Sequence, residues 1–236
     1  RINQIIKDTT TGKGHFKQFI YQSSYATNRH FKAAAEDKKG NIWVGTEIGL
    51  CRLHNDSLYK TPILNSSIQD LDIADLKIDA NGDLWIATLG SGVMLCHINN
   101  ENQPSLTHHF FTSGKYKTNG FLNLLIDRDN IIWMASYNGI FRMEPGTFMF
   151  KFYDAGSGFL NSAYKYIDLI QAADGTIWAA SSLGTVSFNP TNFNGKEGLP
   201  PIHISKVIQN DSVLFFSPTS EKKMYAIPYS KNSISI

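Results

Sequence analysis

The stretch DKKGNIWVGTEIGLCRL, from Asp37 to Leu53, recurs in altered form three more times along the chain. The other copies are DANGDLWIATLGSGVML from Asp79, DRDNIIWMASYNGIFRM from Asp127 and ADGTIWAASSLGTVSF from Ala173. All four tryptophans of the protein belong to this unit, namely Trp43, Trp85, Trp133 and Trp178. Their spacings of 42, 48 and 45 residues match the period of a four-stranded propeller blade. The sequence therefore predicts an all-β fold with four blades of a β-propeller.

Each copy predicts the first three strands of one blade. An apolar run is followed by a polar turn, then by the strand that carries the tryptophan, a glycine corner and a third strand. The first strands are expected at 31–36, 73–78, 121–126 and 166–171. Outer strands are expected at 58–64, 107–111 and 148–153, where β-branched and aromatic residues gather. We interpret the indoles as structural wedges between blades, because a ligand platform need not recur in every blade.

The two ends of the chain lie outside these four units. Residues 2–6 and 16–21 are typical of the last two strands of a preceding blade, and no fourth strand follows Phe188. Four blades and a remnant would leave a large gap in a ring, since propellers close with four to eight tapered blades. We therefore expect residues 1–198 to be the C-terminal part of a larger, seven-bladed propeller, and a second module to occupy residues 199–236.

Composition excludes several classes of function. The formal charge is only +2, from 22 basic and 20 acidic residues, and no basic cluster points to nucleic acid. No apolar stretch approaches the roughly 20 residues that a membrane-spanning helix needs. The start, Arg1-Ile2-Asn3, is not typical of a signal peptide, so the chain is expected to begin in mid-protein.

The sequence predicts neither a metal site nor a cofactor nor catalytic residues. Cys51 and Cys96 fall on third strands and are expected to point to the same side of successive blades, as two buried thiols not joined to each other. No cysteine or histidine has a partner at metal-ligand spacing. The nucleophile-elbow, zinc-protease and phosphate-loop motifs are all missing from the sequence.

The repeat carries a family resemblance. The pattern D-x-x-G-x-I-W-x-G-T-x-x-G-L, complete from Asp37 to Leu50, resembles the two-component regulator propeller repeat. The tail from Pro200 to Ile236 resembles the opening of the triple-tyrosine (Y_Y_Y) domain, an immunoglobulin-like module, and is too short for a sandwich of about 100 residues. Two positions depart from the repeat: Asn130 replaces the turn glycine, and Ala172 replaces the first aspartate.

This resemblance implies the sensor region of a hybrid two-component system of the kind that Bacteroidetes use to sense glycans. Such a region is periplasmic, belongs to an inner-membrane homodimer and signals through the Y_Y_Y domain to a histidine kinase. The transmembrane helix, kinase and receiver that the family implies are not among these 236 residues. The segment itself is therefore expected to be a non-enzymatic sensor with an oligosaccharide as its ligand.

A ligand site is expected at the rim formed by the second-to-third-strand corners and the connections between blades. Its aromatic, amide and cationic residues suit a sugar, although solvated loops are polar in any case. The candidate ligand-binding residues are Arg29, His30, Lys117, Asn119, Tyr137, Asn161, Tyr164 and Lys165.

Two questions stay open at this point. The residues ten before each tryptophan are Ala33, Asp75, Asn123 and Asp168, and these either line a water-filled channel or bond to neighbouring backbone amides. The alternatives to a sensor are a propeller lyase or glycosidase, or a structural spacer without a ligand. An enzyme would have to draw on the carboxylates of Glu47, Asp70 and Asp72.

Overall fold

The computed structural model describes residues 30–55, 57–67, 71–110, 118, 120–154, 168–181 and 184–193, with the backbone of strands 2–7, 14–21, 207–209, 212–214 and 234–235. The chain divides into two compact units, residues 1–190 and 191–236. The predicted boundary after residue 198 lies outside the described residues and stays a prediction. The second unit contains three short antiparallel strands, β18 (Val207–Gln209), β19 (Ser212–Leu214) and β20 (Ile234–Ser235), with β18 in the middle. An immunoglobulin-like fold for this unit stays a prediction.

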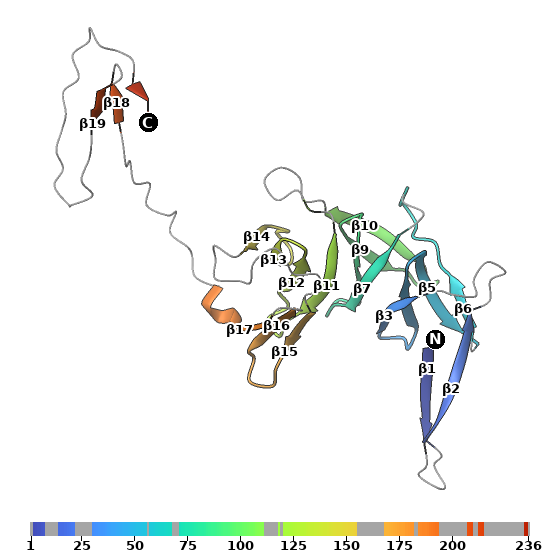
Figure 1. The fold of residues 1–236 in the computed structure, drawn as a ribbon. Coiled ribbons are helices and arrows are strands. Elements are labelled where there is room, and N and C mark those ends of the chain that lie inside the picture. Colours follow the sequence, from blue (N-terminus) through green and yellow to red (C-terminus); the bar gives the residue numbers. More distant parts are fainter. Residues whose placement is uncertain are drawn as a thin grey trace. The chain divides into compact units, whose positions relative to one another are not determined.

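The first unit contains four successive sheets, one for each tryptophan, and the strands of each blade are antiparallel, which confirms the predicted propeller blades (Figure 1). Blade 1 consists of β3 (Phe31–Glu36), β4 (Ile42–Thr46), β5 (Gly49–His54) and β6 (Ser57–Lys60). Blade 2 consists of β7 (Ile73–Ile78), β8 (Leu84–Thr88), β9 (Val93–Ile98) and β10 (Pro104–Phe110). Blade 3 consists of β11 (Phe121–Ile126), β12 (Ile132–Ser136), β13 (Gly139–Met143) and β14 (Phe150–Tyr153). Blade 4 has β15 (Asp168–Gln171), β16 (Ile177–Ser181) and β17 (Gly184–Phe188), followed by a 3₁₀ turn, η3 (Pro190–Phe193).

An aspartate fixes the first hairpin of each of the first three blades. In blade 1, Asp37 Oδ1 accepts the backbone N–H groups of Lys39 and Asn41, both at 2.9 Å, and its Oδ2 accepts the indole N–H of Trp43 at 3.0 Å. The same indole bond joins Trp85 to Asp79 at 3.1 Å and Trp133 to Asp127 at 2.7 Å. The carboxylate thus holds the turn and sets the orientation of the indole, because a buried donor needs an acceptor.

The indoles of blades 1 to 3 are buried against the next blade. Trp43 lies in one apolar cluster with Ile73, Leu76 and Ile86 of blade 2, and Trp85 lies in another with Phe121 and other residues of blade 3. The ring of Trp133 is 5.1 Å from that of Phe188 in blade 4. Burial of an aromatic side chain of about 150–250 Å² contributes on the order of 4–6 kcal/mol.

Trp178 of blade 4 is less buried than the other three tryptophans, because 43% of the residue is exposed. Ile170, its partner across the strand pair, is exposed as well. The position of the missing aspartate is occupied by Ala172, which offers no carboxylate to the indole. Wedging between two blades is therefore seen for three of the four tryptophans within the described residues.

The hairpin at the start of the chain is placed differently from our expectation. Strands β1 (Ile2–Lys7) and β2 (Gly14–Tyr21) pair with each other, and β2 then pairs in parallel with β6, through Ile20 opposite Ser57 and Tyr21 opposite Leu58. The hairpin therefore extends the sheet of blade 1 instead of forming the end of a preceding blade. An outer strand presents unpaired N–H and C=O groups, so it readily accepts a further strand.

Both cysteines are buried and neither forms a disulfide, as predicted. Cys51 lies in the cluster of Val44 and Leu58 on one face of blade 1, and Cys96 lies on the face of blade 2 that contacts Trp43. Burial, with a smaller contribution from the negative charge of Asp83, raises the pKa of Cys96 to about 12. The thiol of Cys96 is therefore a packing group and not a nucleophile.

Candidate functional site

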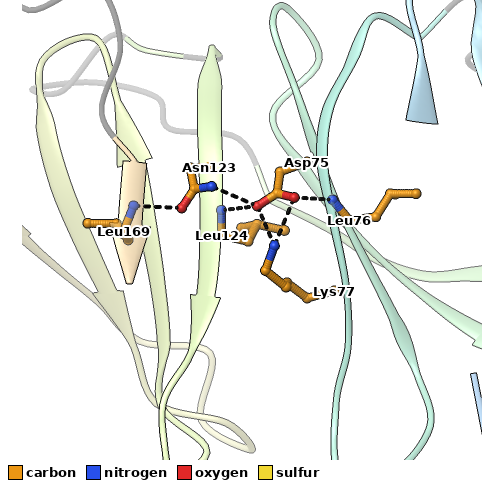
Figure 2. A network of polar contacts seen from close by, with 6 residues as sticks. All are labelled: Asp75, Leu76, Lys77, Asn123, Leu124 and Leu169. Carbon is orange, nitrogen blue, oxygen red and sulfur yellow. Dashed lines mark hydrogen bonds and ion pairs between the residues drawn. The ribbon is translucent and has the colours of Figure 1, made fainter. Parts of the chain in front are cut away.

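A polar network joins the inner strands of blades 2, 3 and 4 (Figure 2). Asp75 Oδ2 on β7 accepts the backbone N–H of Leu124 at 2.8 Å and the side-chain amide of Asn123 at 3.0 Å, both from β11. Asn123 Oδ1 in turn accepts the backbone N–H of Leu169 on β15 at 3.0 Å. Of the two alternatives for this column of residues, bonding to neighbouring amides is the one seen for Asp75 and Asn123.

Only 7% of Asp75 is exposed, yet its carboxylate is well compensated. Oδ1 accepts the N–H of Leu76 at 2.8 Å, and Lys77 Nζ lies 2.8 Å from Oδ1 and 2.7 Å from Oδ2. A buried carboxylate is tolerated when its lone pairs are filled in this way. The register of the strand pair shifts immediately before Asp75, and again before Asn123, and such bulges redirect a side chain out of the regular pleat. The bulges thus help to bring these two side chains to the next blade.

Hydroxyl groups stiffen the corner between the second and third strand of every blade. Thr46 donates its hydroxyl to the Gly49 carbonyl at 2.8 Å and accepts the N–H of Ile48 at 3.2 Å. The same donor bond to a glycine carbonyl is made by Thr88 to Gly92, Ser136 to Gly139 and Ser181 to Gly184. These corners therefore form a fixed base for the residues that they present at the rim.

Polar side-chain contacts at the rim join segments within blade 1 and join blade 1 to blade 2. His30 Nδ1 lies 3.1 Å from Glu47 Oε2, which joins the start of blade 1 to its own corner. Lys32 pairs with Asp72 at the start of blade 2. The backbone carbonyl of Asp72 accepts the N–H of Leu89 at 2.9 Å, so the same residue also holds the corner of blade 2.

Tyr137 continues this rim on blade 3. A Cβ atom added at Gly120 would lie 3.0 Å from both the Tyr137 ring and the carbonyl oxygen of Leu89, so the ring lies closely against the backbone there. Its side chain is still 41% exposed. We define the rim site as His30, Lys32, Glu47, Asp72 and Tyr137, which present one aromatic face and four ionisable groups from three consecutive blades.

The structure places two of the eight candidate ligand-binding residues. His30 and Tyr137 both lie at this rim, on blades 1 and 3, with the Leu89 corner of blade 2 between them. Lys32 was not among the predicted ligand-binding residues, although its place near the start of a first strand could have indicated that it lies at the rim. The remaining candidates lie outside the described residues: Arg29, Lys117, Asn119, Asn161, Tyr164 and Lys165.

The carboxylates that an enzyme would need have other partners. Glu47 is bound to His30 and Asp72 to Lys32, and Asp70 lies outside the described residues. Among the residues that the structure describes, no group of three potential ligands is arranged for a metal ion. No helix in that part of the chain is both long and apolar enough to cross a membrane.

A separate hollow of about 400 Å³ adjoins the Gly49 corner of blade 1. It lies between β5 and the connection that leads from β6 to blade 2, and neither of the two described candidates, His30 and Tyr137, lines it. This hollow was not predicted, because its described lining residues belong to no recognisable motif.

Comparison with known families and relatives agrees with this architecture. Residues 25–47 match the two component regulator propeller family. The chain is 24% identical over 195 residues to histidine kinase P4 from Formosa agariphila, an alignment that covers 79% of this chain and 14% of the relative. The predicted resemblance to two-component regulator propellers is thereby confirmed, and the chain spans only a small part of the curated relative.

Two solved structures share the fold. The extracellular domain of the putative hybrid two component system BT3049 from B. thetaiotaomicron matches with a TM-score of 0.61 and 21% identity, over 93% of this chain and 29% of that chain. A streptogramin B lyase matches with a TM-score of 0.53 and 13% identity, over 75% of this chain and 59% of that chain. These likenesses confirm the propeller fold.

Proposed function

We propose that this chain is the ligand-sensing segment of a periplasmic sensor in a hybrid two-component system, and that its rim site binds an oligosaccharide. The observation that carries the proposal is the rim itself, where three blades present an exposed tyrosine ring among paired ionisable groups. The likeness to a histidine kinase and to an extracellular domain supports the class of protein and its compartment.

The chemistry of the rim suits a sugar. The half-exposed ring of Tyr137 offers an apolar face for the C–H side of a pyranose, and His30, Glu47, Lys32 and Asp72 offer donors and acceptors for hydroxyl groups. The His30–Glu47 contact and the Lys32–Asp72 ion pair are both partly exposed, so the hydroxyl groups of a ligand can replace water there at a modest cost in free energy.

Signalling requires that the ligand bind one conformation more tightly than another. A difference of a few kcal/mol between two dimer geometries is enough to shift a population from mostly off to mostly on. In our proposal the full-length protein is a homodimer, and a bias in its geometry passes through the Y_Y_Y domain to a kinase. The network of Asp75 and Asn123 supports this idea, because it couples the inner strands of three successive blades.

A carbohydrate-active enzyme is the alternative, and the likeness to a lyase fold is the observation that favours it. That likeness concerns the fold alone, and the two described carboxylates at the rim are already in ion pairs. We therefore propose that this segment is non-catalytic.

Calorimetric titration of the 236-residue chain with a panel of oligosaccharides, followed by chromatography of each mixture, distinguishes the classes. The sensor proposal expects at least one oligosaccharide to bind and to be recovered intact. Recovery of a cleaved or eliminated product would establish the enzyme instead. Failure of every member of a broad panel to bind would favour the spacer.

A further inference from the structure

Gly120 lies between the corner of blade 2 and the aromatic ring of the rim site. It is buried and directly precedes β11. A Cβ atom built on it would lie 3.0 Å from the Leu89 carbonyl oxygen, and 3.0 Å and 3.2 Å from Cε2 and Cδ2 of Tyr137. Cβ atoms rarely make contacts this short, so any side chain at this position would have to displace the carbonyl group or the ring.

The carbonyl on the side of blade 2 is firmly held. The N–H of Leu89 donates to the Asp72 carbonyl at 2.9 Å. Thr88, the residue before it, donates its N–H at 3.0 Å and its hydroxyl at 2.8 Å to the Gly92 carbonyl, and its hydroxyl oxygen accepts the N–H of Ser91 at 2.8 Å. A shift of the Leu89 peptide would strain these bonds, so this side of the gap resists displacement.

The ring on the side of blade 3 is free to yield. The backbone of that corner is fixed, because the Ser136 hydroxyl donates to the Gly139 carbonyl at 2.9 Å and accepts the N–H of Asn138 at 3.3 Å. The Tyr137 ring, in contrast, is the far end of a side chain that is 41% exposed. Crowding at residue 120 would therefore move the ring and leave both corners in place.

The need for glycine at this position is steric and not conformational. Gly120 is not among the glycines that have a positive φ angle, so its backbone conformation is open to alanine as well. What alanine would add is the Cβ atom alone.

We propose that Gly120 is the positioning residue of the rim site. The missing side chain lets the Tyr137 ring lie against the Leu89 backbone, and this contact sets the orientation in which the ring meets a ligand. The effect on binding rests on the proposed function of the rim, whereas the effect on the ring itself does not.

The test compares two glycines that lie near Leu89. Gly120→Ala adds a methyl group against the ring, and Gly90→Ala is the matched control, because no atom of the described residues lies within 4 Å of a Cβ built there and its φ angle is not positive either. Both changes are made in the parent 236-residue chain and in the Tyr137→Ala variant. Circular dichroism and urea unfolding establish how stably each variant folds.

Fluorine NMR of the chain labelled with 3-fluorotyrosine reports the ring without any ligand. The Tyr137 resonance is assigned by its loss in Tyr137→Phe. It should shift in Gly120→Ala and stay in place in Gly90→Ala. An unchanged resonance in folded Gly120→Ala would overturn the proposal. If Gly120→Ala does not fold, the Tyr137→Ala background should restore folding, and failure to do so would overturn the proposal equally.

Calorimetry then measures the effect on an oligosaccharide that the chain binds. Its Kd should rise about two- to fourfold in Gly120→Ala, since a gap of about 0.5–1 Å forfeits about a quarter to a half of a van der Waals contact. Gly90→Ala should leave the Kd unchanged, and Gly120→Ala should cause no further loss once Tyr137 is alanine. An equal loss in both backgrounds would show that Gly120 does not act through the ring. If no oligosaccharide binds, the proposed function fails, and the fluorine resonance still decides the role of Gly120.

Discussion

The carboxylate of Asp75 on blade 2 accepts the backbone N–H of Leu124 on blade 3 at 2.8 Å. This bond joins the inner strands β7 and β11 of two successive blades. The same carboxylate also accepts the N–H of Leu76, so its removal would leave two buried donors without their acceptor.

Asp75→Ala is therefore expected to lower the free energy of unfolding by about 2–4 kcal/mol, since each abandoned buried donor costs about 1–3 kcal/mol. The control is Asp72→Ala, which breaks a more exposed pair with Lys32 and should cost no more than about 1 kcal/mol. Urea unfolding followed by fluorescence measures both. Equal losses of unfolding free energy in the two variants would show that the Asp75 bond between blades stabilises the protein no more than an exposed ion pair does.

Ala172→Asp is expected to stabilise the protein, because it restores the aspartate that lies six residues before the tryptophan in the other three repeats. The new carboxylate can accept the indole N–H of Trp178 and the backbone N–H of Asp174, whereas the N–H of Thr176 already donates to Asp174 Oδ1 at 2.9 Å, for a gain of about 0.5–1.5 kcal/mol. Ala172→Leu supplies no acceptor and serves as the control. A stability unchanged or lowered by Ala172→Asp would contradict the role we assign to this carboxylate.

Two corner glycines give a matched steric comparison. Gly139 and Gly184 have positive φ angles of 150° and 154°, so alanine is strained at both, at about 1–3 kcal/mol. A Cβ at Gly139 would lie only 2.3 Å from the carbonyl oxygen of Tyr153 on the fourth strand, whereas at Gly184 no atom of the described residues lies within 4 Å. Chemical denaturation should therefore show a clearly larger loss for Gly139→Ala than for Gly184→Ala. The reverse order would be incompatible with this blade geometry.

Acid should weaken the first hairpin. Burial raises the pKa of Asp37, but the hydrogen bonds from Asn41, Trp43 and Lys39 outweigh burial and hold the pKa below its ordinary value of 3.8. A depressed folded-state pKa adds stability above the unfolded pKa, and this stability is lost as pH falls through the lower folded value. The stability difference between the parent chain and Asp37→Asn should thus be largest near pH 7 and shrink below about pH 4. A difference that stays constant down to about pH 2.5 would refute this prediction.

The repeat made most of the blade strands predictable. The first strands of blades 1 to 3 have the expected bounds, because the turn residues, tryptophan and corner glycine all fall at fixed offsets. The aspartate-to-indole bond was not predicted, although its signal was present in the spacing of Asp37, Asp79 and Asp127 from their tryptophans.

Contacts between distant segments were harder to predict. The parallel pairing of β2 with β6 joins segments almost 40 residues apart and leaves no periodic trace in the sequence. The exposure of Trp178 depends on what covers blade 4, which the repeat does not specify. At the rim, residue type alone suggested His30 and Tyr137, but the pairing of Lys32 with Asp72 depends on how two blades meet.

The most direct test of the account compares two tyrosines of similar exposure in oligosaccharide binding. Tyr137 at the rim is 41% exposed, and Tyr59 on the outer strand of blade 1 is 43% exposed. For an oligosaccharide that the chain binds, calorimetry should show a loss of affinity of about fivefold or more for Tyr137→Ala, if a ring stacked on the tyrosine is worth about 1–3 kcal/mol as stacked bases are, and no change for Tyr59→Ala. Equal affinities of the parent chain and Tyr137→Ala, or a loss confined to Tyr59→Ala, would contradict a binding site at the rim.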